Sequence, residues 1–97
     1  MQEFEVAHLH EKGQDMIIVF VHGRVGTWTD EKREQLSAQL QICAESAGLA
    51  GSVVLIWQTS LGRSEFLAPK PWHPFLKSVS YQMLAGNINK KLTCKNL

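Results

Sequence analysis

Residues 19–36, VFVHGRVGTWTDEKREQL, pass from an apolar run through a loop with two glycines into a charged segment. The apolar run favours a strand. The charged segment favours a helix, because its acidic residues lie in the first turns, where the helix dipole stabilises negative charge. Thr27 or Thr29 can serve as the N-cap of this helix. The stretch therefore predicts a strand, a tight loop and a helix in direct succession.

The residues before this stretch predict a β-hairpin. Residues 4–10 alternate between apolar and polar side chains, and a turn that contains Gly13 leads into the apolar run at 16–21. The second strand is apolar on both faces, so we expect it in the interior of a sheet. The sequence leaves the turn length open, and with it the register of the two strands.

The residues after the stretch complete a β-α-β unit. Apolar side chains recur at helical spacing up to Ala47, and Gly48 can supply the left-handed residue that ends a helix. Residues 52–58 form a third apolar run. A strand, a helix and a strand in this order predict two parallel strands joined by a right-handed crossover.

The C-terminal part predicts a short strand and a helix. The SLGR corner can fold residues 64–68 back as a fourth strand that ends before Pro69. Pro74 suits the first turn of a final helix, whose apolar stripe reaches Met83. Residues from about 87 to 97 are interpreted as a last frayed turn or a basic tail.

Together these elements predict an α/β (α+β) fold in a single globular domain that spans residues 1–97. We expect a small single-sheet sandwich, with a β-hairpin followed by β-α-β, the short fourth strand as an option, and a C-terminal helix. A chain of 97 residues with 44% hydrophobic content is long enough for one core and too short for two.

The order of these elements resembles the start of the STAS domains of anti-sigma-factor antagonists, in which two strands, a helix and a strand lead to a serine-bearing turn. The corresponding turn here is TSLG, residues 59–62. Gln58 and Thr59 stand where that family has an acidic residue before the serine, and this chain ends before the later elements. We infer no membership of the family.

Charge is distributed unevenly along the chain. Residues 1–62 carry four bases and eight acids, whereas residues 63–97 carry six bases and one acid. This asymmetry is expected if the two halves attract each other. It also fits a basic surface for an acidic protein partner or for nucleic acid.

The cysteines and the apolar runs bear on location. Cys43 and Cys94 lie far apart and in no metal-binding spacing, so we expect no disulfide framework and a reducing, cytoplasmic location. The N-terminus does not resemble a signal peptide. No apolar run approaches the length of a membrane span, which is about 20 residues, so we expect a soluble protein with no membrane partner.

Two polar loops follow the predicted parallel strands, HGRVGT at 22–27 and QTSLGR at 58–63. The carboxyl ends of parallel strands meet at one edge of a sheet, where α/β proteins commonly bind ligands, and these loops would suit a small anion. The alternative is that their glycines only make corners. PKPWHPF at 69–75 could stack on a ligand, or it could be a hydrophobic staple for the final helix. The candidate ligand-binding residues are His22, Arg24, Thr27, Ser60, Arg63, Trp72 and His73.

The sequence assigns no metal site, no cofactor and no catalytic residue. His8 and His10 share a face of their strand and could approach His22, but zinc requires three or four ligands in a tight set. Ser60 and Ser64 lack the Gly-x-Ser-x-Gly pattern of a nucleophile elbow. We therefore expect a protein that binds and does not catalyse.

Coverage of the sheet predicts association of two copies. Two strands are apolar on both faces, and two helices cover them barely, or on one face only. The third strand is also an exposed edge unless residues 64–68 pair with it. We therefore expect a homodimer through the third strand or through an uncovered sheet face.

The function predicted from these patterns is that of a small soluble non-enzymatic binding or adaptor module that acts as a homodimer. The first alternative is a small-ligand (anion) binding protein, or an enzyme, that uses the crevice at the strand ends. The second alternative is a nucleic-acid binder that uses the basic C-terminal third.

Overall fold

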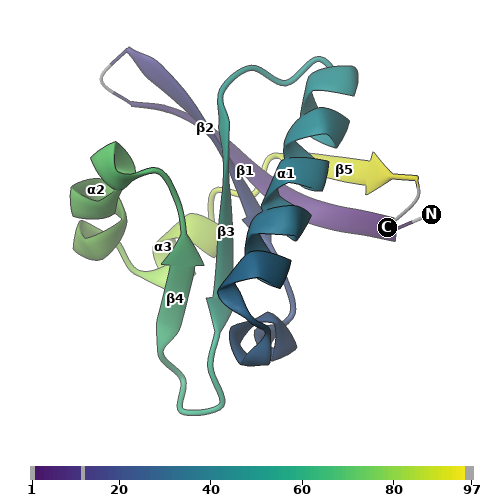
Figure 1. The fold of residues 1–97 in the computed structure, drawn as a ribbon. Helices are drawn as coiled ribbons and strands as arrows, with labels where there is room; N and C mark the ends of the chain where they lie inside the picture. Colours follow the sequence, from purple (N-terminus) through teal and green to yellow (C-terminus); the bar gives the residue numbers. More distant parts are fainter. Residues whose placement is uncertain (1, 12, 96–97) are drawn as a thin grey trace.

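The chain folds around a five-stranded sheet (Figure 1). The structure is a computed structural model that describes residues 2–11 and 13–95. The strand order is β4-β3-β2-β1-β5, so the strands that are apolar on both faces, β2 and β3, lie in the interior. The predicted α/β (α+β) fold is confirmed, including its short fourth strand. The strands are β1 Gln2–Glu11, β2 Gln14–Phe20, β3 Ser52–Gln58, β4 Ser64–Leu67 and β5 Lys90–Cys94.

The hairpin and the β-α-β unit set the direction of the central strands. β1 and β2 pair antiparallel with Val6 opposite Val19, and Gly13 in their turn has a φ of +76°, which favours glycine. β2 and β3 are parallel, and α1 (Asp30–Ser46) is the crossover between them. The C-terminal ends of β2 and β3 therefore lie at the same edge of the sheet.

Thr29, one of the two predicted N-caps, begins α1. Its Oγ1 accepts a hydrogen bond from the backbone N–H of Lys32 at 3.2 Å, so one of the free donors of the first turn is paired. Thr27 instead donates its hydroxyl hydrogen to the carbonyl oxygen of Arg24 at 2.7 Å. The helix ends before Gly48, whose φ of +82° is the left-handed stop that the sequence predicted.

Helices cover both faces of the sheet (Figure 1). α1 packs on one face, and the other face carries η2 (Lys70–Trp72), α2 (His73–Ser78) and α3 (Tyr81–Ala85). Each face holds a separate apolar core, and no polar or charged side chain is buried among the described residues. Burial of a Val, Leu or Ile side chain contributes about 1.5–3 kcal/mol, which makes these two cores the main source of stability.

The predicted final helix is broken into α2 and α3. Val79 is extended, with φ −118° and ψ 153°, and Ser80 caps α3 by accepting the backbone N–H of Met83 at 3.0 Å. One continuous helix beginning at Pro74 is therefore wrong. Because of the break, Leu84 is buried against the sheet, whereas Met83 remains 56% exposed.

β5 corrects the interpretation of the C-terminus as a frayed tail. Lys90–Cys94 pairs antiparallel with the start of β1 and forms one edge of the sheet, with Leu92 and Cys94 buried. The prediction of a tail from about residue 87 is therefore wrong for this strand. Residues 96–97 lie outside the described residues.

Cys43 and Cys94 form a disulfide, which the sequence analysis did not expect. Their Cα atoms lie 5.8 Å apart because α1 packs over β5, although the two residues are separated by 51 positions. Cysteine usage therefore no longer supports a reducing, cytoplasmic location. Among the described residues, no helix has the length and apolar character needed to cross a membrane.

β3 is not an edge of the sheet. β4 pairs along its outer side, from Leu55 opposite Leu67 to Gln58 opposite Ser64. Only residues 52–54 of the third strand are left unpaired on that side, and helices among the described residues lie on both sheet faces. The two structural reasons for expecting a homodimer are removed by this topology.

Candidate functional site

An open hollow of about 790 Å³ lies where β2 and β3 end, at the lower end of the sheet in Figure 1. The two strands are parallel, so the segments that follow them meet at this edge and form the crevice expected of an α/β sheet. The hollow brings together four of the candidate residues, namely His22, Arg24, Thr27 and Ser60.

Two glycines allow η1 (Gly23–Thr27) to pack closely against β3. A Cβ on Gly23 would collide with the carbonyl oxygen of Gln58, and a Cβ on Gly26 would lie 2.8 Å from Nε1 of Trp57. Real Cβ atoms do not approach other atoms so closely, so both positions exclude a side chain. The glycines of this loop therefore serve its contact with β3.

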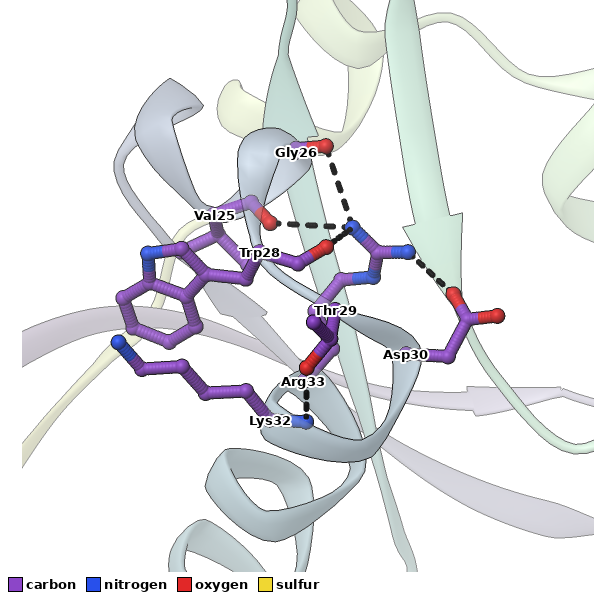
Figure 2. A network of polar contacts seen from close by, with 7 residues as sticks. All are labelled: Val25, Gly26, Trp28, Thr29, Asp30, Lys32 and Arg33. Atoms are coloured by element: carbon purple, nitrogen blue, oxygen red, sulfur yellow. Dashed lines mark hydrogen bonds and ion pairs between the residues drawn. The ribbon is translucent and has the colours of Figure 1, made fainter.

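Arg33 ties the carbonyl groups of the same loop to α1 (Figure 2). Its Nη1 donates to three carbonyl oxygens, those of Val25 at 3.2 Å, Gly26 at 3.1 Å and Trp28 at 2.8 Å. Its Nη2 pairs with the carboxylate of Asp30. Hydrogen bonds from a charged donor are stronger than neutral ones, so Arg33 fixes the position of η1.

The backbone of the loop after β2 is thus held in place by the protein, and its side chains line the hollow. Its carbonyl groups are held by Arg33, and the backbone N–H of Arg24 donates to Nδ1 of His22 at 3.1 Å. With Nδ1 as the acceptor, a neutral His22 ring carries its proton on Nε2. The side chains of His22, Arg24 and Thr27 are exposed and line the hollow. A ligand would therefore meet a guanidinium, an imidazole and a hydroxyl group.

Ser60 lies in the tight turn between β3 and β4. The backbone N–H of Thr59 donates to the carbonyl oxygen of Arg63 at 2.7 Å, and the N–H of Arg63 donates back to Oγ1 of Thr59 at 3.3 Å. Arg63 therefore closes the turn through its backbone. Ser60 lines the hollow, whereas Arg63 does not.

Trp72 and His73 lie outside the hollow, on the face that carries α2. Trp72 is only 9% exposed and belongs to the core on that face. Nε2 of His73 lies 2.9 Å from the carbonyl oxygen of Ala68, and its ring meets Phe66 edge-on with centroids 5.1 Å apart. This packing fits the alternative in which PKPWHPF is a hydrophobic staple.

Tyr81 and Glu65 line the hollow although no sequence pattern indicated them. Tyr81 reaches this position because the chain breaks between α2 and α3, and its ring packs edge-on against Phe20 with centroids 5.5 Å apart. Burial, and to a lesser extent the nearby Glu5 carboxylate, raises the pKa of the Tyr81 phenol above 10.0. The phenol therefore stays protonated at neutral pH and can donate a hydrogen bond.

Alkaline titration of Tyr81 checks this placement. It is the only tyrosine in the chain, so ultraviolet difference absorbance follows its ionisation directly, and we expect a midpoint above 10. The folded-state pKa is raised, so the stability that Tyr81 contributes is complete below about pH 10 and is lost as the pH rises through the folded pKa. Glu5→Gln should lower the midpoint. A midpoint at or below 10 in the folded protein would contradict this partly buried position.

The basic residues of the C-terminal third are spread over the fold. Arg63 precedes β4 at one edge of the sheet, whereas Lys90 and Lys91 lie on β5 at the opposite edge. Lys70 and Lys77 belong to η2 and α2. Nucleic-acid binders usually concentrate such residues on one surface, so this arrangement does not favour the nucleic-acid alternative.

His8 and His10 have partners within the fold. Nε2 of His8 lies 2.8 Å from the carbonyl oxygen of Ala50, and Nδ1 of His10 lies 2.5 Å from Oδ1 of Asp15. Both lie toward the hairpin, at the other end of the sheet from His22. Within residues 2–11 and 13–95, no group of three or more His, Cys, Asp or Glu side chains is arranged to hold a metal ion.

Comparison with protein-family models, curated proteins and solved structures gives no match for this chain. The resemblance of its TSLG turn to STAS domains is therefore not accompanied by a matching family model. The fold and the hollow define a small α/β protein with a crevice at the ends of two parallel strands.

Proposed function

We propose that the protein is a non-enzymatic binding module that holds a small oxyanion, such as a phosphate or carboxylate group, in the hollow at the ends of β2 and β3. The observation that carries the proposal is that Arg24 and His22 line the same hollow as the hydroxyl groups of Thr27 and Ser60. A guanidinium binds oxyanions through a fork of N–H donors, and hydroxyl groups can complete the set of hydrogen bonds.

The exposure of these side chains favours binding over catalysis. His22, Arg24, Thr27 and Ser60 are all exposed, whereas catalytic acids and bases typically owe their altered pKa values to burial and to close charged partners. Tyr81 has a pKa raised away from the neutral range, which suits a hydrogen-bond donor. The hollow thus supplies exposed donors for an anion, and the carboxylate among its lining residues, Glu65, is exposed as well.

Arg24→Ala tests the proposal. We expect it to weaken the binding of inorganic phosphate about tenfold or more, because a charged hydrogen bond contributes about 1.5–3 kcal/mol. Arg24 is exposed, so the free energy of unfolding should change by less than about 0.5 kcal/mol. Isothermal titration calorimetry measures the binding, and urea denaturation measures the stability.

The matched control for Arg24→Ala is Lys70→Ala. Lys70 follows β4 at the end of the sheet opposite the hollow, so this variant loses the same charge away from the proposed site. Phosphate affinity should remain that of the original chain. Equal losses of phosphate affinity in the two variants would mean that the overall positive charge of the protein, and not the hollow, attracts the anion. A loss of stability with unchanged binding would mean that the loop is only a corner.

Association of two copies stays a prediction that is independent of this site. The outermost strands of the described sheet are β4 and β5. β4 is short, and β5 carries the exposed Lys90 and Lys91, features that discourage pairing between sheet edges. Light scattering over a dilution series tests the dimer, and a monomer mass at high concentration would contradict it.

A further inference from the structure

Trp57 carries a buried hydrogen-bond donor that has no partner. Its side chain is 3% exposed in the core between the sheet and α1, and Nε1 finds no acceptor among the described residues. Buried polar groups are nearly always paired, because an unpaired donor loses its bonds to water and gains nothing in return. Phenylalanine would bury an aromatic ring here without that cost. The presence of an indole N–H at this buried position therefore requires an explanation.

Gly26 borders both this donor and the proposed ligand site. The position that a Cβ would occupy on Gly26 is 2.8 Å from Nε1. Gly26 and Glu65 line the hollow at the strand ends, and both also line a second hollow of about 410 Å³ that Trp57 and Arg33 border. Gly26, which has no side chain, is thus a residue that the surroundings of the indole nitrogen and the lining of the ligand site have in common.

η1 is the segment that must shift if a ligand is to reach Nε1. It is anchored by the buried Val25, and Arg33 donates to the carbonyl oxygens of Val25 and Gly26, so a displacement of Gly26 has to lengthen or break the 3.1 Å bond to its own carbonyl group. A ligand can stabilise a displaced position of η1 only if it binds the displaced state more tightly than the original one. A new hydrogen bond from Nε1 would supply this difference, because it pairs a donor that is otherwise unpaired.

We propose that the Trp57 indole N–H is the donor that anchors the bound oxyanion, and that Gly26 moves aside as the anion enters. This inference rests on the proposed function and adds the donor that holds the ligand: an oxygen of the phosphate or carboxylate group accepts from Nε1. Arg24 and Arg33 border the two hollows with positive charge. Glu65 borders both with negative charge, which disfavours polyanions, so Glu65→Gln should tighten phosphate binding.

The experiment is a titration of ¹⁵N-labelled protein with inorganic phosphate, repeated with acetate to separate the two sources of the oxyanion. The chain has three tryptophans, so its spectrum contains three indole N–H signals, and Trp57→Phe identifies the one of interest. We expect the Trp57 indole proton to move downfield and to saturate at the same concentration as the backbone amide of Arg24. The indole signals of Trp28 and Trp72 should stay in place.

Affinity provides the second measurement. Trp57→Phe should weaken phosphate binding about tenfold, the effect of losing one hydrogen bond to a charged acceptor. Trp28→Phe is the matched control, because Trp28 lies outside the hollow, and it should leave the affinity unchanged. If Trp57→Phe does not fold, through-bond correlation to the assigned Trp57 backbone identifies the indole signal, and its response in the original chain decides the matter alone.

The possible outcomes separate this inference from the proposed function. Saturation of the Arg24 amide with a stationary Trp57 indole signal overturns the inference and leaves the function standing. Unchanged phosphate affinity in a folded Trp57→Phe variant does the same. If neither signal moves with phosphate or with acetate, the proposed function and the inference both fail.

Discussion

Replacing Cys43 with serine is expected to lower the free energy of unfolding by about 4 kcal/mol. The disulfide joins residues 51 positions apart, and a cross-link that closes a loop of this length removes much of the conformational entropy of the unfolded chain. The disulfide also connects α1 to β5, a part of the sheet in which each strand has only one pairing partner. β5 pairs only with β1, and the start of β1, at Gln2–Glu5, pairs only with β5, so α1 holds this corner through packing and through the disulfide.

Reduction of the original chain provides the control. A thiol reductant should lower the urea midpoint of the original protein to nearly that of Cys43→Ser, and it should not change the midpoint of the variant. Hydrogen exchange should accelerate mainly in β5 and in the first residues of β1. An original chain whose midpoint is the same with and without reductant would show that the disulfide does not constrain the fold.

Arg33→Ala is expected to lower the free energy of unfolding by about 3 kcal/mol. The guanidinium donates to the carbonyl oxygens of Val25, Gly26 and Trp28 and pairs with Asp30, and its side chain is only 17% exposed (Figure 2). Alanine would leave these partly buried carbonyl groups without their donor, and hydrogen bonds to charged groups contribute about 1.5–3 kcal/mol each. The loss is smaller than their sum because one nitrogen serves all three acceptors.

Lys32→Ala is the matched control for Arg33→Ala. Lys32 is the preceding residue on α1, and its Nζ lies 4.3 Å from the centroid of the Trp28 ring in an exposed cation–π contact, which contributes about 0.5–1 kcal/mol. Arg33→Lys should behave like Arg33→Ala, since an ammonium cannot match the planar fork of the guanidinium. Urea denaturation measures all three. Equal, small losses in all of them would contradict the role assigned to Arg33.

The central part of the fold could be predicted because its signals are local. The apolar run that became β2, the cap at Thr29, the stop at Gly48 and the second apolar run that became β3 each lie within a few residues of the element they define. The helix stripe was nearly right as well, except that Ala44 rather than Ala47 faces the core.

The C-terminal part could not be predicted in the same way because its partners are distant in sequence. Leu92 and Cys94 alternate with exposed residues, as in any strand with one buried face, but only pairing with β1 at the other end of the chain makes this segment a strand. The disulfide could not be predicted for the same reason, because the sequence spacing of Cys43 and Cys94 does not indicate that they are in contact.

The sequence predicted the location of those candidate site residues that directly follow a strand. His22, Arg24, Thr27 and Ser60 follow the two parallel strands, and the direction of those strands brings them together. Trp72 instead packs in the core on the face that carries α2. Tyr81 was missed because its position depends on the break between α2 and α3, whereas the apolar stripe up to Met83 predicted one continuous helix.

The measurement that tests the central claim most directly is a map of all backbone amide shifts during a titration with inorganic phosphate. The hollow at the ends of β2 and β3 predicts that the largest shifts fall at residues 22–27 and 58–60, with a smaller response at Tyr81. Shifts centred on Lys70 and Lys77 or on β5, or no saturating shift anywhere, would contradict a ligand site at the strand ends.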